Sequence, residues 1–140
     1  MIEYFKKYPE KLHALPPRKF EEFIASIFKY HGFLVELTPE TRDGGLDIIA
    51  IESNKLTGES KYLIECKRYS PENKVGIGIV QRMLGVIEYE KATKGIIATT
   101  STFSKDAILF SNRYSHHKLT LSDYNSIKYW LSCLQGLQRA

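Results

Sequence analysis

The sequence predicts an α/β domain in which a mixed β-sheet of about five strands is flanked by helices. Helical and strand periodicities alternate along the chain in the order α-β-β-β-α-β-α-β-α. Short connections join the first three strands and favour antiparallel pairing, whereas a helix between the third and fourth strands favours a parallel crossover. The chain shows no internal repeat and no linker, so we expect a single domain over residues 1–140.

Proline and apolar spacing mark the first helices. Residues 2–12 form a loose helical pattern, which Pro16 and Pro17 end. The next segment is the clearest helix of the chain, because one face recurs at helical spacing until Gly32 stops it. That face is formed by Phe20, Phe23, Ile24, Ile27, Phe28 and His31.

Three strands follow this helix. Residues 33–37 and 61–67 have the branched and aromatic composition of strands. Residues 46–52 are apolar on both faces apart from Asp47, which indicates a buried strand. The polar segment 53–60 is expected to be a hairpin-type loop.

The second half of the chain alternates helices with short strands. A helix is expected from Val75 to about Glu90, and Gly85 within it predicts a close approach to the sheet. Residues 95–99 have the composition of a compact buried strand, and residues 119–121 that of a last short strand.

Helix ends are marked in the second half as well. Phe103 and Ser104 predict a hydrophobic staple and an N-cap, with Ile108 packing on Phe103. Ser122 is predicted to cap the final helix, and Gly136 is predicted to end it.

Composition excludes several classes of protein. With 43% hydrophobic and 26% charged residues, the chain is typical of a globular domain rather than a disordered one. Its net charge of +4 is compatible with nucleic acid binding. The two cysteines are far apart, which argues against a structural zinc site. No secretory signal or transmembrane run is visible, so we expect a cytoplasmic protein without a membrane partner.

Acidic residues stand inside two of the predicted strands. Glu65 and Lys67 share one face of their strand because side chains alternate, and Cys66 points to the other face. Asp47 lies near the start of the adjacent strand, where pairing would bring it beside Glu65. Two neighbouring carboxylates repel each other, and an oxygen-bound divalent cation, Mg²⁺ or Mn²⁺, relieves the repulsion.

The same residues allow other interpretations. A structural ion pair between these acids and Lys67 or Arg68 also accounts for charge within an apolar strand. Beside a metal ion, Lys67 could hold or deprotonate the attacking water, or stabilise the pentavalent phosphorus. The spacing does not choose between these roles.

Three short motifs occur in order along the chain, namely Gly44-Gly45-Leu46-Asp47, Glu65-Cys66-Lys67, and Gln81 with Gly85. Together they resemble the PD-(D/E)xK nuclease superfamily and, within it, the Mrr-like restriction endonuclease domain. The resemblance covers about residues 17–135. It departs from the superfamily name at Leu46, where the name has proline.

The resemblance implies a restriction-endonuclease-like fold and Mg²⁺-dependent hydrolysis of DNA phosphodiesters, with Mn²⁺ as a substitute. Asp47, Glu65 and the backbone carbonyl of Cys66 would be metal ligands. Lys67 would be the catalytic lysine.

Two helix residues would assist this site. Gln81 would reach it from its own helix, and Glu21 matches a helix-borne acid that lies near the metal in related nucleases and resolvases. Each also has a simpler interpretation. Gln81 could be a boundary residue of an amphipathic helix, and Glu21 an acid favoured in a first turn by the helix dipole.

Basic residues close to the site in sequence would contact DNA phosphates and give salt-dependent, sequence-independent affinity. Taken singly, each is also an ordinary surface charge. The predicted DNA-binding residues are Arg42, Arg68, Lys74 and Arg82, with Lys55 and Lys61 as further members of the ring.

We therefore expect a Mg²⁺-dependent DNA endonuclease that acts in restriction or defence. A homodimer is expected because a double-strand break needs two cuts. No separate target-recognition domain is expected within residues 1–140, so a specificity subunit could supply recognition. The alternatives are a structure-selective junction resolvase or repair nuclease, and a catalytically idle DNA- or partner-binding module with the same fold.

Overall fold

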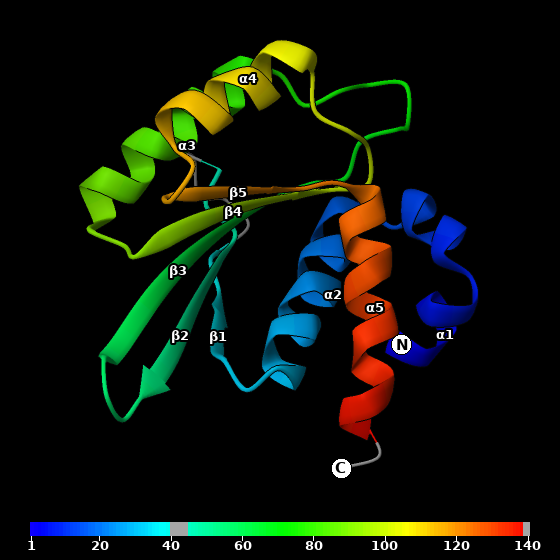
Figure 1. Ribbon diagram of the computed structural model, residues 1–140. Coiled ribbons are helices and arrows are strands. Elements are labelled where there is room, and N and C mark those ends of the chain that lie inside the picture. The colour runs from blue at the N-terminus through cyan, green and yellow to red at the C-terminus, as the bar shows by residue number, and fades with distance from the viewer. Residues whose placement is uncertain (40–44, 139–140) are drawn as a thin grey trace.

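The computed structural model describes residues 1–39 and 45–138, without the side chains of 135–138. Its helices and strands follow the predicted order (Figure 1). They are α1 (Ile2–Lys7), the 3-10 helix η1 (Pro9–Ala14), α2 (Pro17–Tyr30), β1 (Leu34–Leu37), β2 (Ile48–Asn54), β3 (Gly58–Lys67), α3 (Ile77–Glu90), β4 (Lys94–Thr99), α4 (Lys105–Tyr114), β5 (Leu119–Ser122) and α5 (Tyr124–Gln138).

The strands form one five-stranded sheet in the order β1-β2-β3-β4-β5. β1, β2 and β3 pair antiparallel, whereas β3, β4 and β5 pair parallel. The predicted mixed sheet is therefore confirmed. Because β2 runs against β3, with Ile48 opposite Ile64, the start of β2 lies beside the carboxyl end of β3. This edge of the sheet brings together the acidic residues of the two strands.

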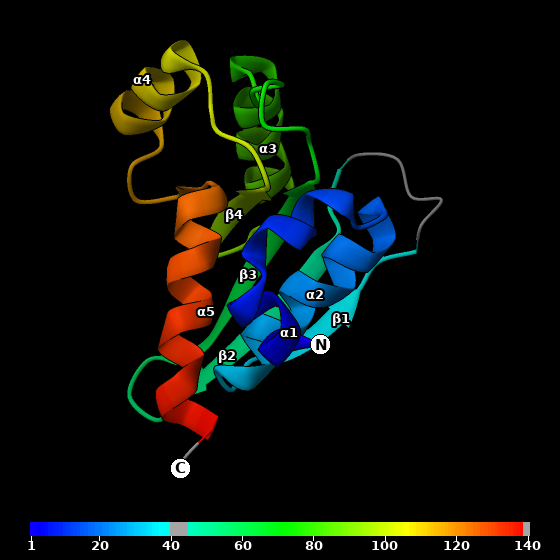
Figure 2. The same cartoon turned by 90° about the vertical axis from the view of Figure 1, so that its right-hand side faces the viewer.

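Helices cover both faces of the sheet (Figures 1 and 2). α2 and α5 pack on one face, where Phe23, Ile24 and Ile127 are buried, and α1 lies outside them. α3 and α4 pack on the other face over a second core that includes Val80 and Met83. A sheet covered on both faces requires central strands that are apolar on both sides. None of the helices in the described ranges is long and apolar enough to span a membrane.

Two predicted segments differ from the structure. The loose helix over 2–12 is divided into α1 and η1, because Pro9 begins a new helix. The predicted loop 53–60 is largely strand, since β2 and β3 continue into a tight hairpin. In its turn the Asn54 side-chain oxygen accepts hydrogen bonds from the backbone N–H groups of Leu56 and Thr57, at 2.8 and 3.2 Å. This Asx-type turn allows polar residues to extend the ladder.

One of the two predicted N-caps is confirmed and the other is wrong. Ser104 caps α4, accepting a hydrogen bond from the backbone N–H of Ala107 at 3.3 Å. The prediction that Ser122 caps α5 is wrong, because Ser122 ends β5 and the Asp123 carboxylate accepts from the backbone N–H of Ser126 at 2.9 Å. Either residue type can cap a helix, and the sheet register decides which one does. Gly136 does not end α5, which continues to Gln138.

The close approach between α3 and the sheet does not occur at Gly85. A Cβ atom built on Gly85 would meet nothing within 4 Å, so that prediction is wrong. The approach occurs at Gly95 of β4, where a Cβ atom would lie 2.5 Å from Cδ1 of Ile87. The glycine of the strand, rather than the glycine of the helix, lets α3 pack closely.

Candidate active site

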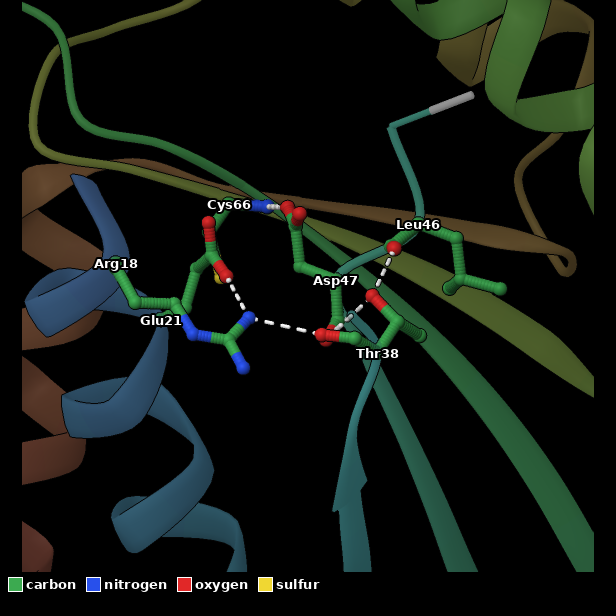
Figure 3. A network of polar contacts seen from close by, with 6 residues as sticks. All are labelled: Arg18, Glu21, Thr38, Leu46, Asp47 and Cys66. Carbon is green, nitrogen blue, oxygen red and sulfur yellow. Dashed lines mark hydrogen bonds and ion pairs between the residues drawn. The ribbon is translucent and has the colours of Figure 1, made fainter. Parts of the chain in front are cut away.

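Asp47 is held by backbone hydrogen bonds just before β2 begins. Its backbone N–H donates to the carbonyl of Ile64 at 3.0 Å, and its own carbonyl accepts from Thr38 N–H at 2.9 Å. Its side-chain Oδ2 accepts from the backbone N–H of Cys66 at 2.7 Å (Figure 3). The carboxylate of one strand is therefore fixed against the backbone of the next.

Glu65 lies on the face covered by α3 and is 0% exposed. Lys67 shares this face, as predicted, and its Nζ lies 2.9 Å from Oε2 of Glu65. The Arg82 guanidinium reaches the same oxygen from α3. The other oxygen, Oε1, is buried and has no hydrogen-bond partner within residues 1–39 and 45–138. A buried carboxylate oxygen without a donor is costly, and a cation bound to it would remove that cost.

Gly45 provides the space in which Glu65 and Arg82 meet. Its φ angle is +77°, a conformation that favours glycine. A Cβ atom at this position would lie 2.7 Å from both terminal nitrogens of Arg82 and 2.7 Å from Oε2 of Glu65. Gly45, two residues before Asp47 in the sequence motif, is therefore required by the packing of the site.

Glu21 approaches the site from the other face of the sheet, on α2. Arg18 Nη1 lies 3.0 Å from Glu21 Oε1 and also donates to the carbonyl of Thr38 at 2.8 Å. This links the first turn of α2 to the segment that precedes Asp47 (Figure 3). Glu21 and Asp47 belong to one polar network, and the negative charge of Glu21 contributes to raising the pKa of Asp47 (Figure 3).

The pKa of Asp47 is raised from 3.8 to about 6, and burial is the largest cause of this shift. The Cys66 N–H hydrogen bond opposes this shift, the charges of Glu21 and Glu65 add to it, and Lys67 lowers the pKa. Burial and the Asp47 charge also raise the pKa of the Cys66 thiol. Cys66 therefore offers the site its backbone rather than a thiolate.

The donor atoms of this site fit a hard divalent cation. Asp47 and Glu65 supply carboxylate oxygens, one of them buried without a partner, and such ligands suit Mg²⁺ or Mn²⁺. Within the described part of the chain no group of three or more His, Cys, Asp or Glu side chains has metal-binding geometry. Among the described residues, the backbone carbonyl of Cys66 is a further oxygen that could bind the cation.

The raised pKa of Asp47 predicts a pH-dependent stability. Below the unfolded pKa near 4, the Asp47 carboxyl group is neutral in both the folded and the unfolded protein. As the pH rises through about 6, the buried carboxyl group ionises at a cost in free energy, and the folded protein loses stability. Asp47→Asn removes this loss and keeps an acceptor for Cys66 N–H. After discounting for solvent screening, we expect the variant to be about 1–2 kcal/mol more stable than wild type at pH 7.5, with no difference near pH 4.

Urea unfolding in EDTA at both pH values measures the effect. A gain in the free energy of unfolding that is equal at the two pH values would contradict it, since only an ionised carboxylate carries the penalty.

The sequence of the chain matches a known family over most of its length. Residues 12–131 match the family model Mrr_cat, whose description is restriction endonuclease. The chain belongs to this restriction endonuclease family. The relationship predicted from the motifs is therefore confirmed.

A curated relative of this restriction endonuclease domain is the uncharacterized protein y4cE of Sinorhizobium fredii (strain NBRC 101917 / NGR234). It is 33% identical over 123 residues, which are 86% of this chain and 31% of that protein. The chain thus spans about a third of the length of the curated relative that it matches.

Three solved structures share the fold. The DNA modification-dependent restriction endonuclease AspBHI has a TM-score of 0.67 at 21% identity, covering 99% of this chain and 38% of that chain. MspJI restriction endonuclease in complex with a 27-mer oligonucleotide has a TM-score of 0.64 at 15% identity, covering 99% and 35%. AF1548, a protein of unknown function, has a TM-score of 0.67 at 18% identity, covering 86% and 67%. The restriction-endonuclease-like fold of this domain is confirmed.

The structure of the domain brings some predicted site residues together and separates others. Asp47, Glu65, Lys67 and the Cys66 backbone meet at one edge of the sheet, with Glu21 nearby. Gln81 is exposed on α3 and makes no hydrogen bond or ion pair within the described ranges. Its neighbour Arg82, predicted to contact DNA, contacts Glu65 instead.

The predicted basic ring is also divided. Arg68 binds the carbonyl of His13 on the other face of the sheet, and Lys74 is exposed in the loop after β3. Lys55 and Lys61 lie toward the hairpin end of β2 and β3, away from Glu65. Arg42 falls outside the described residues, as does Gly44 of the motif.

Sequence reasoning missed the site roles of Arg82, Arg18 and Thr38. For Arg18 a signal exists, since an Arg–Glu pair at i,i+3 on a helix is a recognised favourable spacing. Thr38 is buried, and its hydroxyl donates to the carbonyl of Leu46 at 2.6 Å. This contact joins residues that are eight positions apart in the sequence and leaves no local pattern.

Proposed function

We propose that this domain is a metal-dependent endonuclease that hydrolyses DNA phosphodiester bonds in a restriction or defence system. The observation that carries the proposal is the meeting of Asp47, the buried Glu65 and Lys67 at one edge of the sheet. Family membership and the fold of AspBHI and MspJI support it. A bound Mg²⁺ would supply positive charge against the phosphate and a more acidic water.

The residues of the chain have separable tasks in this proposal. Asp47 and Glu65 would hold the cation, with the Cys66 carbonyl as a further oxygen ligand. Lys67, 2.9 Å from Glu65 and 22% exposed in its side chain, lies where it could meet both the carboxylate and a phosphate arriving from solvent. Arg82 neutralises Glu65 from α3, which favours an ordered carboxylate before a cation binds.

Partners belong to the same proposal. DNA would be the substrate, two copies of the domain would make the two cuts of a double-strand break, and target recognition would come from a further domain or a separate subunit. We also propose Gln81 and Glu21 as assisting residues that act from α3 and α2. Lys74 and Arg82 would contribute to phosphate contacts when DNA is bound.

Plasmid cleavage tests the proposed activity. Wild type should nick or linearise supercoiled DNA with Mg²⁺ or Mn²⁺ and not in EDTA, and Asp47→Asn should be at least about 100-fold slower because one ligand of the cation loses its charge. Glu59→Gln is the matched control, since it removes one negative charge from the exposed start of β3. The proposal fails if wild type cleaves with neither ion, or if Asp47→Asn keeps the wild-type rate.

A four-way junction offered beside linear duplex separates the two nuclease alternatives. Preferential cleavage of the junction would identify a structure-selective resolvase, which uses the same residues on a different substrate. DNA binding without cleavage of either substrate would favour the idle binding module.

A further inference from the structure

Three hydroxyl groups at the carboxyl end of β4 hold the segment that follows Lys67. Thr99, Thr100 and Ser101 are consecutive and buried, with exposed fractions of 0%, 1% and 2%. Each side chain donates a hydrogen bond to a backbone carbonyl at or after the end of β3. The acceptors are, in order, the carbonyls of Lys67 at 2.6 Å, Tyr69 at 2.7 Å and Pro71 at 3.2 Å. Successive donors of one segment therefore meet alternate residues of the other.

Lys67 lies where β3 loses its strand partners. The register of β3 with β2 ends at Ile64, three residues before Lys67. The register with β4 ends at Lys67 itself, opposite Thr99. The ends of a strand open more readily than its centre, because fewer neighbours hold them. A residue at this position therefore needs contacts beyond the strand ladder to stay in place.

The carbonyl of Lys67 accepts hydrogen bonds from three donors. Besides Thr99 Oγ1, these are the backbone N–H groups of Tyr69 at 3.1 Å and Thr100 at 3.3 Å. The Thr99 contact is the shortest, and its hydroxyl has a fixed direction because Oγ1 also accepts from the backbone N–H of Ser101 at 3.1 Å. The Thr99 hydroxyl therefore fixes the peptide group next to the Lys67 side chain.

The far end of the segment 68–76 is fastened to the same part of the chain. Val75 pairs with Phe103 in a parallel bridge, so the segment reaches the start of α3 beside the chain that follows β4 (Figure 1). The two cations that contact the buried carboxylate stand on either side of this segment. Lys67 comes directly before it, and Arg82 follows it on α3. The path of the segment therefore influences both cations.

We propose that the side chains of Thr99, Thr100 and Ser101 form a hydroxyl clamp that holds Lys67 in its place in the site, with Thr99 as the positioning residue. Thr99 is fully buried, so it acts through the backbone of Lys67 rather than on DNA. A displacement of about 1 Å in an active site costs about 10²-fold in rate. The clamp itself stands on the hydrogen bonds, and only its effect on cleavage rests on the proposed nuclease function.

Thr99→Val tests the clamp, because valine keeps the shape of threonine and replaces the hydroxyl with a methyl group. We expect single-turnover cleavage with Mg²⁺ to slow by about 10–100-fold, since Lys67 is less well placed. Duplex affinity in Ca²⁺ should stay within about twofold of wild type, because no group that meets DNA is removed. Thr99→Ser keeps the hydroxyl and should recover the rate to within about threefold of wild type.

Ser115→Ala is the matched control. Ser115 is also buried, and its hydroxyl donates to the carbonyl of Ser111 at 3.0 Å. It lies between α4 and the amino end of β5, at the opposite edge of the sheet from Thr99. Both variants remove one buried hydroxyl and should lower the melting temperature by about 2–5 °C. Only Thr99→Val should slow cleavage.

Amide hydrogen exchange in EDTA, followed by NMR, tests the clamp without cleavage. Tyr69 and Thr100 keep their acceptor in Thr99→Val, because the carbonyl of Lys67 remains. If the hydroxyl holds this part of the chain, the two amides should exchange about tenfold faster in Thr99→Val than in wild type. In Ser115→Ala they should exchange at the wild-type rate.

The outcomes separate the clamp from the nuclease activity. The clamp is overturned if the two amides exchange no faster in Thr99→Val, or if an active enzyme keeps its cleavage rate in that variant. Equal losses of rate in Thr99→Ser or in Ser115→Ala would also overturn it, because methyl packing or general stability would then explain the effect. If wild type cleaves no DNA, faster exchange in Thr99→Val still supports the clamp, and only the nuclease proposal fails.

Discussion

Lys67→Met is expected to slow DNA cleavage by about 10²–10⁴-fold, the range associated with loss of a positioned proton-transfer or charge-stabilising group. Lys67 Nζ is the ammonium that lies 2.9 Å from the buried Glu65, and methionine removes its charge while keeping a side chain of similar length. The variant should still fold, because Arg82 continues to neutralise Glu65. Duplex affinity in Ca²⁺ should change by less than about tenfold. Single-turnover cleavage with Mg²⁺ measures the rate.

Lys61→Met is the matched control for this prediction. Lys61 lies on the same strand and, six residues earlier, on the same face, but near the hairpin end of β3, opposite Ile51. Removing its charge should leave the cleavage rate within about twofold of wild type. Equal losses in the two variants would show that general electrostatics, rather than the position of Lys67, controls the rate.

Gly45→Ala is expected to reduce cleavage by about 100-fold without removing any group that takes part in the chemistry. The added Cβ atom would lie 2.7 Å from Oε2 of Glu65 and from both terminal nitrogens of Arg82. The Arg82 side chain is 40% exposed and can swing toward solvent, but Glu65 is fully buried, and displacing it would disturb its ion pair with Lys67. A displacement of about 1 Å in an active site costs about 10²-fold in rate. Plasmid cleavage measures the loss of activity, and thermal unfolding measures any loss of stability.

Gly58→Ala separates the effect of backbone strain from the effect of contact between the added Cβ atom and Glu65. Gly58 has a similar φ of +84°, but a Cβ atom there would meet nothing within 4 Å. Both variants should lose about 1–2 kcal/mol of stability through the left-handed conformation alone. Only Gly45→Ala should lose activity. A comparable loss of cleavage in Gly58→Ala would mean that backbone strain, and not contact with Glu65, explains the result.

The sequence motifs predicted that Gln81 reaches the site from α3, but in the structure Arg82 is the residue of α3 that contacts Glu65. Gln81 and Arg82 flank the buried stripe of Val80 and Met83 on opposite sides, so helical periodicity does not choose between them. The orientation of α3 on the sheet determines which of the two side chains faces Glu65. A longer side chain with a charge then reaches a fully buried carboxylate, while Gln81 remains exposed.

Several features follow from the sequence alone because they depend on covalent geometry or on local periodicity. Glu65 and Lys67 share a face because side chains alternate along any strand. The antiparallel pairing of the first three strands and the parallel crossover to the fourth follow from apolar periodicity and from the length of each connection. Side-chain alternation and the pairing of adjacent strands were sufficient to predict that Asp47, Glu65 and Lys67 lie together. The structure brings the three residues to one edge of the sheet.

Other features were decided by the tertiary structure. Gly95 rather than Gly85 admits α3, since the close contact depends on which side chain of the helix lies over the strand. Arg68 turns to His13 because η1 packs on that face of the sheet, a contact between residues far apart in sequence. The pKa of Asp47 reaches about 6 through burial and through neighbours on other elements. Local patterns specify which face a side chain takes, and only packing specifies what it meets there.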